Sequence, residues 1–447
     1  MLYRKITSKI ETFYKESKNA LLVTGARQTG KTYSIRNYGK AYKSFVEINF
    51  IENPEAKRIF EGITGPADIL LRLSALTSHP LIPGETLIFF DEIQECDDVL
   101  TAIKFLVEDG RYRYILSGSL LGVELKDIKS EPVGYMGVME MYPLDFQEFA
   151  INAGLRSEVL DNIRNCWDTK QKVDDVVHDR MIQLFRLYLV VGGMPAAVAK
   201  YVSTNNLQTV LNTQRDIISL YRRDISKYAE KDSLKIKEIF DMIPSELDAK
   251  NKRFILKRLN EHAKYERYKD SFLWLKDVGV AIPVYNVEEV RVPLQLASQR
   301  NLFKLFSNDV GLLAAQYAEG IQLRIINGDK DINFGSVYEN VVAQELTAHG
   351  VTPYYYNNKR RGELDFVISI KGEAIPIEVK SGKDYEEHRA LSNVMSCKDP
   401  EIKEAIVFSN FNLSVDGKII YAPVYMCGFI HKDISAPTHY RLDLSDL

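Results

Sequence analysis

The chain has 447 residues, a length that suggests about three domains, and its 45% hydrophobic content is enough for several buried cores. The net charge of −3 excludes any conclusion about partners from overall charge, so local patches must indicate them. The four cysteines are widely scattered and never spaced C-x-x-C, which argues against a zinc site or a disulfide framework and predicts reduced thiols.

The N-terminal residues carry charge without the apolar segment of a signal peptide behind them. The longest apolar-rich run without charges, residues 187–199, has thirteen residues. That is too short to cross a bilayer. We therefore expect a soluble, cytoplasmic protein without a membrane partner.

The first predicted strand leads into a phosphate-binding loop. Leu21–Val23 is a short apolar run typical of a buried strand. The next residues fit the P-loop pattern G-x-x-x-x-G-K-[ST], and they are Gly25, Ala26, Arg27, Gln28, Thr29, Gly30, Lys31 and Thr32. The backbone N–H groups of such a loop surround a phosphate, and the helix predicted over residues 31–38 presents its positive end to the anion. We expect Lys31 to reach the β- and γ-phosphates and the Thr32 hydroxyl to ligate Mg²⁺, so the predicted cofactors are ATP and Mg²⁺.

Two further strands are predicted, over residues 45–50 and 87–90. The later one ends in Asp91 and Glu92, a Walker B pattern. Asp91 is expected to hold Mg²⁺ through its water shell, and Glu92 to orient or deprotonate the attacking water. An ordinary exit from strand to loop is the alternative, and the P-loop upstream favours the catalytic interpretation.

A helix is predicted over residues 99–108 and a strand over 114–116, followed by Ser117, Gly118 and Ser119. Ser119 is a candidate sensor of the γ-phosphate, although Ser and Gly at a strand end are also typical of a plain turn. The alternation of strands and helices up to about residue 145 predicts a parallel sheet flanked by helices.

The middle of the chain is predicted to be helical over residues 156–228, with a break at Gly192–Pro195. Residues 229–315 give three short helices and then a strand pair, the outline of a winged helix. Between residues 250 and 269, eight Lys and Arg oppose two Glu, a local balance of +6. Phosphate contacts with a duplex and a solvated helix face are both consistent with this balance.

A new α/β unit is predicted from about residue 332, with a helix over 334–349 and strands over 354–356, 364–368 and 374–379. Tyrosines in the first of these strands and the cations of residues 359–361 after it interleave rings with positive charge. This pattern is typical of a single-stranded nucleic-acid contact and also of a strand followed by a solvated turn.

The last two strands carry a second chemical pattern. Asp365 lies in one of them, and Glu378 and Lys380 end the next. Strand residues two apart share a face, so a hairpin would place Asp365 beside both. Such carboxylates can hold a divalent metal, the lysine can position a water at a scissile phosphate, and Glu339 on the preceding helix is an additional candidate ligand. Structural charges at strand ends remain the alternative.

Together these motifs resemble the AAA+-like ATPases of bacteria and archaea that carry a C-terminal DUF4143 domain, and the resemblance covers nearly the whole chain. In addition to the P-loop and the Walker B strand, it rests on Ile115–Ser119, Tyr142–Phe149, Gly192–Pro195, Tyr221–Ile225 and Leu305–Leu313, and on the PD-(D/E)xK nuclease set Glu339, Asp365, Glu378 and Lys380.

The fold class expected from pattern and resemblance is α/β, in four parts. These are an AAA+-like P-loop core with a parallel sheet (residues 1–155), a helical lid (156–228), a winged-helix-like domain (229–320) and a restriction-endonuclease-like α/β domain (321–447). The family often has Gly-Arg before its Tyr-Pro-Leu motif, and that arginine is a candidate trans-acting finger. Here the loop has Val133, Gly134 and Tyr135, with Lys129 the nearest cation. Slow hydrolysis is therefore expected unless Arg111, Arg113 or a residue elsewhere takes the role.

The function expected is ATP binding and slow hydrolysis, coupled to a C-terminal module that binds nucleic acid, with DNA as the expected partner. Two alternatives remain open. The protein is an ATP-gated, metal-dependent DNA nuclease with Asp365, Glu378 and Lys380 as its catalytic residues, or a nucleotide-dependent switch that binds a protein partner without catalysis. Assembly into a homo-oligomer is a further possibility under each of them.

Overall fold

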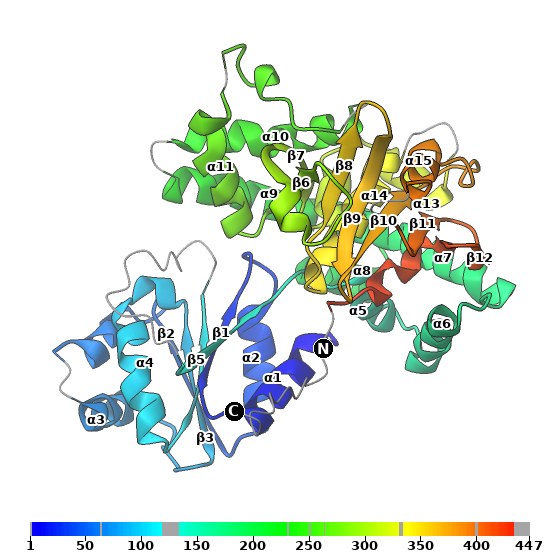
Figure 1. The fold of residues 1–447 in the computed structure, drawn as a ribbon. Helices are drawn as coiled ribbons and strands as arrows, with labels where there is room; N and C mark the ends of the chain where they lie inside the picture. Colours follow the sequence, from blue (N-terminus) through cyan, green and yellow to red (C-terminus); the bar gives the residue numbers. More distant parts are fainter. Residues whose placement is uncertain are drawn as a thin grey trace, which may run out of the picture.

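The computed structural model describes residues 2–62, 65–118, 134–229, 232–249, 252–262, 264–329, 334–397 and 401–432. The chain forms two bodies (Figure 1). We call residues 2–141 the N-terminal body, which is blue to cyan in Figure 1, and residues 144–432 the C-terminal body, which is green to red.

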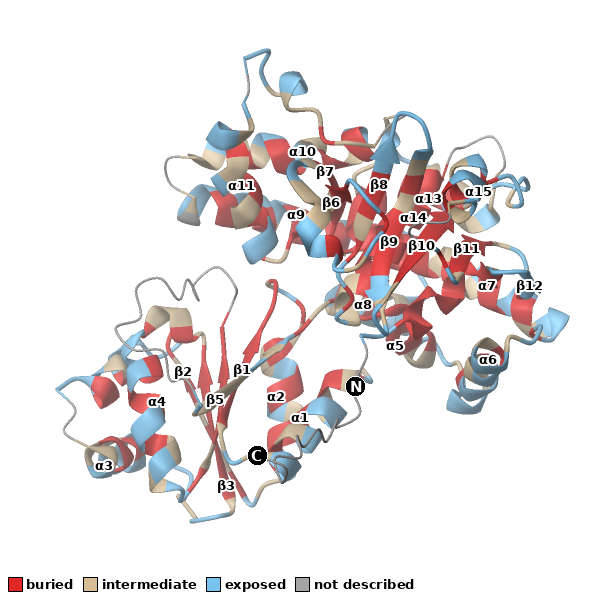
Figure 2. Ribbon diagram, viewed as in Figure 1, coloured by how far each residue is buried: buried red, intermediate tan, exposed pale blue. Residues whose placement is uncertain are grey.

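The N-terminal body is a five-stranded parallel sheet with the order β2-β3-β4-β1-β5. Its strands β1 and β3 are buried along their whole length because helices cover both faces of the sheet (Figure 2). Separate apolar clusters fill the two faces. The elements are α1 (Lys5–Glu16), β1 (Ala20–Thr24), α2 (Lys31–Gly39), β2 (Ser44–Asn49), α3 (Pro66–Leu76), β3 (Thr86–Asp91), α4 (Asp98–Asp109), β4 (Arg113–Ser117) and β5 (Met136–Glu140). The predicted parallel sheet is confirmed.

A helical layer follows the crossing from β5. Asp145 caps the first helix by accepting from the backbone N–H of Glu148 at 2.7 Å, and Glu148 accepts in return from the backbone N–H of Asp145 at 3.2 Å. The break at residues 192–195 is present, because Gly192 has φ +68° and ends a helix there. The helices are α5 (Phe146–Asn152), α6 (Ser157–Thr169), α7 (Asp175–Val191), α8 (Pro195–Thr204), α9 (Leu207–Tyr228), α10 (Ser233–Asp248) and α11 (Tyr265–Asp277).

The remaining strands form one mixed sheet of eight, in the order β12-β13-β11-β10-β9-β8-β6-β7. Strands β8, β9 and β10 run antiparallel in sequence, and β11 lies parallel to β10. The elements are β6 (Ala281–Val287), β7 (Ser298–Ser307), α12 (Val310–Ala315), α13 (Ile321–Asn327), α14 (Gly335–Ala348), β8 (Tyr354–Asn358), β9 (Gly362–Ile370), β10 (Glu373–Val379), α15 (Arg389–Met395), β11 (Ala405–Ser409), β12 (Ser414–Asp416) and β13 (Ile419–Pro423).

This sheet corrects the expected division of the chain. The predicted hairpin β6–β7 forms, but β6 pairs in parallel with β8, so the hairpin is the edge of the larger sheet and not the wing of a separate winged-helix domain. One continuous apolar cluster extends from Leu144 to Ile430 and includes α5 through α11. The expected boundaries at 155, 228 and 320 therefore do not coincide with breaks in the hydrophobic core.

Within the described ranges, none of the helices combines the length and the apolar composition that crossing a bilayer requires.

Candidate functional site

The P-loop connects β1 to α2 and has the backbone that the motif requires. Gly25 has φ +144°, and a Cβ on it would lie 2.2 Å from the carbonyl oxygen of Met141. Gly30 has φ +91° and Gln28 has φ +67°. These conformations turn the loop around the N-terminus of α2, where backbone N–H groups and the helix end favour an anion.

Lys31 is buried and folds back over its own loop. Its Nζ donates to the carbonyl oxygens of Gly25 and Ala26, each at 3.0 Å. Burial lowers the pKa of Lys31 to about 8, against the opposing effect of Glu92 and Asp91. Phosphate oxygens are stronger partners for an ammonium group than peptide carbonyls, so an entering polyphosphate would take over these two hydrogen bonds.

Asp91 joins three strands of the sheet at the P-loop. It accepts from the Thr32 hydroxyl at 3.1 and 3.2 Å, from the Asn49 amide at 2.9 Å, and from the Ser117 hydroxyl. Burial raises the pKa of Asp91, although its hydrogen bond with Ser117 works in the opposite direction. The hydroxyl of Thr32 and the carboxylate of Asp91 are hard oxygen donors at the phosphate end of the loop, and this donor chemistry fits Mg²⁺.

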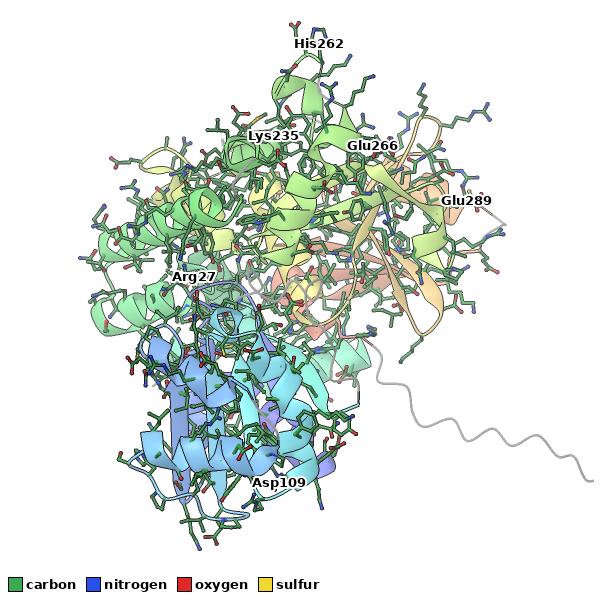
Figure 3. The ribbon with its side chains drawn as sticks, turned by 90° about the vertical axis from the view of Figure 1, so that its left-hand side faces the viewer. Arg27, Asp109, Lys235, His262, Glu266 and Glu289 are labelled. Atoms are coloured by element: carbon green, nitrogen blue, oxygen red, sulfur yellow. The ribbon has the colours of Figure 1, made fainter. Side chains whose placement is uncertain are left out.

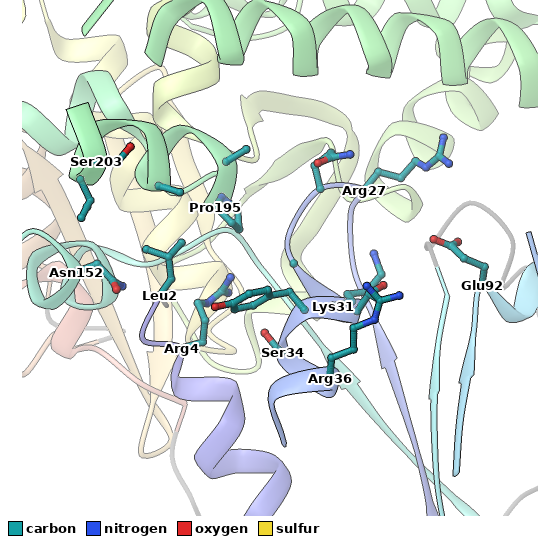
Figure 4. Close-up of a pocket in the computed structure, with 17 residues that line it drawn as sticks. Leu2, Arg4, Arg27, Lys31, Ser34, Arg36, Glu92, Asn152, Pro195 and Ser203 are labelled. Carbon is teal, nitrogen blue, oxygen red and sulfur yellow. The ribbon is translucent and has the colours of Figure 1, made fainter. Parts of the chain in front are cut away.

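Glu92 lies next to this network in a left-handed conformation with φ 57°. Its carboxylate accepts from the Gln94 amide at 2.5 Å. The left-handed backbone at Glu92 follows directly on β3, and the Glu92 side chain lines the cavity beside the P-loop. Figure 4 shows Glu92 at the end of the cavity away from Leu2 and Arg4.

The cavity has a volume of about 790 Å³ and lies between the two bodies. The P-loop and the start of α2 form one wall, and Pro195, Ala196 and Ala199 of α8 form another (Figure 4). Arg4 connects the P-loop to the C-terminal body: it donates to the carbonyl oxygens of Thr29 at 2.9 Å and Tyr142 at 2.7 Å, and it pairs with Glu148 of α5 at 3.2 Å. The nucleotide cavity is therefore completed by the C-terminal body.

Four residues that the sequence analysis named are not found at the P-loop in the described structure. Ser119 and Lys129 lie outside the described residues. Arg111 pairs with Asp109, and Arg113 donates to the carbonyl oxygen of Ser17 at 2.9 Å; both lie at the start of β4, the end of the sheet away from the P-loop. Neither side chain lies at the P-loop of its own chain.

Sequence reasoning missed the roles of Arg4, Asn49 and Ser117. Ser117 was within reach of prediction, since a hydroxyl directly ends the strand beside Walker B. Arg4 gave no signal, because its partners are about 25 and 138 residues away along the chain.

The second predicted site brings its carboxylates together. Phe366 of β9 pairs with Ile377 of β10, and Asp365 accepts from the backbone N–H of Val379 at 2.8 Å. Lys380 lies 3.2 Å from the carboxylate of Glu378. Burial and then the nearby Asp365 raise the pKa of Glu378 to about 8, and the same causes raise the pKa of Glu339. The predicted hairpin geometry is thus present.

Lysines occupy the space among these carboxylates. Lys304 of β7 is fully buried, 2.8 Å from Glu363 and 3.4 Å from Glu339, and Lys252 also pairs with Glu339. Burial opposes the charge of Lys304, but the adjacent carboxylates raise its pKa. Among the residues that the structure describes, no group of three His, Cys, Asp or Glu is placed to hold a metal ion. Lys252 and Lys304 engage Glu339, and Lys380 engages Glu378, while Asp365 accepts from a backbone N–H.

The basic and aromatic stretch after α14 divides into two parts. Tyr355 and Tyr356 are 0% and 1% exposed, so they belong to the core and cannot stack on bases as the pattern suggested. The cations of residues 359–361 are exposed in the turn between β8 and β9. The exposed cations and the half-buried Tyr354 remain candidates for contact with a polyanion.

Replacing Lys304 tests the role of the lysine-filled cluster. The Lys304→Met protein is expected to be destabilised by about 3 kcal/mol, because Glu339 stays buried with less compensation. Urea unfolding followed by circular dichroism measures this. Lys403→Met, which removes the exposed partner of Glu373, is the matched control and is expected to unfold like the wild type. Equal midpoints for all three proteins would show that Lys304 contributes nothing to stability.

Three parts of the chain match known family models. Residues 17–150 match a family model described as an AAA domain, residues 182–323 a domain of unknown function (DUF8612), and residues 334–426 a domain of unknown function (DUF4143). No curated protein matches the chain.

Among solved structures, the Walker-type ATPase PABY2304 of Pyrococcus abyssi is similar with 13% identity and a TM-score of 0.43, over 71% of this chain and 96% of that one. The ORC1 protein of Aeropyrum pernix in complex with DNA is similar with 13% identity and a TM-score of 0.29, over 74% of this chain and 93% of that one. The chain carries an AAA-type P-loop ATPase domain, whose P-loop supports nucleotide binding, together with a DUF4143 domain.

Proposed function

We propose that the protein binds Mg²⁺-ATP in the cavity between its two bodies, hydrolyses it slowly, and uses the nucleotide state to control the C-terminal body. The observation that carries the proposal is the network at the P-loop, in which Asp91 accepts from Thr32 while Lys31 lies on the loop carbonyls. These groups are the ones that a Mg²⁺-triphosphate requires, and they lie on the loop and the strand end that border the cavity.

The proposed chemistry assigns one task to each side chain. Lys31 neutralises the β- and γ-phosphates, and Thr32 and Asp91 hold the metal, which supplies further charge neutralisation when bound. Water attacks the γ-phosphorus, its proton passes to the Glu92 carboxylate, and the bond to the β-phosphate oxygen breaks to give ADP and phosphate.

Slow hydrolysis is proposed because no cation stands at the position of the family's arginine. Tyr135 occupies it, and its hydroxyl donates to Glu108 at 2.7 Å on an exposed surface. An arginine finger contributes a large rate factor in related enzymes.

For the C-terminal body we propose a nucleic-acid contact, with DNA as the first candidate. Its support is the exposure of Lys257, Lys264 and Arg267 in the basic stretch and of the cations at residues 359–361. Figure 3 places His262 and Glu266 of this stretch at the end of the C-terminal body away from Arg27. The metal-dependent nuclease is not part of the proposal, because Glu339 is paired with Lys252 and Lys304 in this structure.

The experiment measures ATP hydrolysis by the wild type, Lys31→Ala and Asp365→Ala, each with and without duplex DNA. The DNA is then examined by electrophoresis for cleavage. Lys31-dependent hydrolysis that DNA alters, with the DNA left intact, is expected. Equal hydrolysis by both proteins would refute the proposed ATPase, an unchanged rate with DNA would refute the coupling, and Asp365-dependent cleavage would restore the nuclease alternative.

The affinity for ATP is expected to fall as the pH rises through about 8. Lys31 of the free protein loses its proton there, since its pKa is lowered to about 8 by burial. Bound phosphate favours the charged ammonium, so binding takes up a proton above that pH and weakens by up to about tenfold per pH unit. Calorimetry in buffers of different ionisation enthalpy measures both quantities. A constant affinity up to about pH 9.5 would contradict the expectation.

A further inference from the structure

Arg27 stands at the tip of the P-loop, between the phosphate-binding backbone and the C-terminal body. It lines the nucleotide cavity (Figure 4), and Figure 3 shows it where the two bodies meet. Its Nη1 lies 2.6 Å from Oδ1 of Asp224 on α9. The Arg27 side chain is 29% exposed and the Asp224 side chain only 7%. The arginine thus keeps access to the cavity, while its partner is fixed in the body behind it.

Helix α9 holds the backbone at the same point. The hydroxyl of Tyr221, one turn before Asp224, donates to the carbonyl oxygen of Arg27 at 3.1 Å. The ring of Tyr221 is buried and packs edge-on against Phe240 of α10 at 6.4 Å. The tip of the P-loop is therefore attached twice to a helix whose core continues into the DUF4143 domain.

The Arg27–Asp224 pair satisfies only one of the two carboxylate oxygens of Asp224. Oδ2 of Asp224 is buried and has no hydrogen-bond partner within the described part of the chain. Burial raises the pKa of Asp224, although Arg27 lowers it. The charge of Arg27 also contributes to the lowered pKa of Lys31, so both cations act on one region of the cavity. A polyphosphate there would attract both.

We infer that Arg27 exchanges Asp224 for the γ-phosphate when ATP is bound, and returns to Asp224 in the ADP state. This inference rests on the proposed function, since it assigns regulation to the same site. The guanidinium is long enough to reach either partner and offers several donors on one planar group. Release of Asp224 would leave a buried carboxylate without its cation, so α9 responds to whether a γ-phosphate is present.

The exchange predicts opposite effects from the two partners. Asp224→Asn is nearly isosteric and frees Arg27, so it is expected to increase the preference for ATPγS over ADP by about tenfold. Arg27→Ala removes the γ-phosphate contact and is expected to decrease that preference by about tenfold. Fluorescence titration with each nucleotide gives the two dissociation constants, and thermal unfolding confirms that each variant is folded.

The matched control is Asp241→Asn. It breaks the pair of Asp241 on α10 with Arg222 on α9, the helix that also carries Asp224; this pair is 2.8 Å apart. It is expected to leave the preference unchanged. Shifts of Asp224→Asn and Arg27→Ala in the same direction, or no shift, would overturn the exchange and reduce the pair to a structural contact. Failure of the proposed function is recognised by a different result: the affinities for both nucleotides would then be the same in Lys31→Ala as in the wild type.

Discussion

The Lys31→Ala protein is expected to bind ATP at least about a hundredfold more weakly than the wild type and to show no measurable hydrolysis. Lys31 and Arg4 are both buried cations of the nucleotide cavity, and Arg4 is already engaged by Glu148 and by two carbonyl oxygens. Truncation leaves the carbonyl oxygens of Gly25 and Ala26 facing the phosphates. Titration with a fluorescent ATP analogue and a phosphate-release assay measure the two losses.

Lys40→Ala is the control for this variant. Lys40 follows α2 directly and is exposed, so its loss changes the charge of the same helix without touching the cavity. It is expected to bind and hydrolyse ATP like the wild type. If both alanine variants bind ATP normally, the P-loop is not the nucleotide site of this protein.

The Glu92→Gln protein is expected to keep its affinity for ATP and to lose hydrolysis by about 10²- to 10⁴-fold, the usual contribution of a general base. Glutamine keeps the carbonyl oxygen that accepts from Gln94, so the backbone turn after β3 is retained. It cannot accept a proton from the attacking water. A stopped-flow measurement of single-turnover hydrolysis separates this step from binding.

Glu95→Gln tests whether any nearby charge has the same effect. Glu95 lies on the same short turn and is 3.8 Å from Lys57 on the surface. Wild-type turnover is expected for it. Hydrolysis by Glu92→Gln at the wild-type rate would remove Glu92 from the mechanism and leave positioning and charge as the source of catalysis.

The strands and the P-loop of the N-terminal body could be predicted because each is marked by residues that are neighbours in the sequence. The P-loop, the apolar strand before it and the carboxylates after β3 are each contained within a few residues, and the observed strands agree with them to within about two residues at each end. β5 was not predicted, since Met136–Glu140 is only partly buried and Val138 is 65% exposed. An edge strand of this kind has no continuous apolar run to detect.

In the C-terminal body, individual helices and strands were predicted, but the pairing of its strands into one sheet was not. The hairpin β6–β7 was recognised, but its pairing with β8 joins Tyr285 to Tyr354, residues far apart in the sequence. The ion pairs of Lys304 with Glu339 and Glu363 are nonlocal in the same way. Burial of Tyr355 likewise depends on neighbours that only the folded sheet supplies. The spacing of apolar residues predicts which face of a helix or strand is buried, but it does not predict which other element packs against that face.

The shared sheet limits how this protein can be divided and recombined. The DUF4143 match begins at residue 334, after β6 and β7, so a gene fragment cut there encodes β8 with an open edge. That fragment would also lack Lys304 and Lys252, leaving Glu339 as an uncompensated charge in its interior. Open strand edges pair with other chains, so the isolated fragment would aggregate. We therefore expect the preceding segment and the DUF4143 segment to fold as one unit, so that exchange of modules between genes preserves the fold only when the two are transferred together.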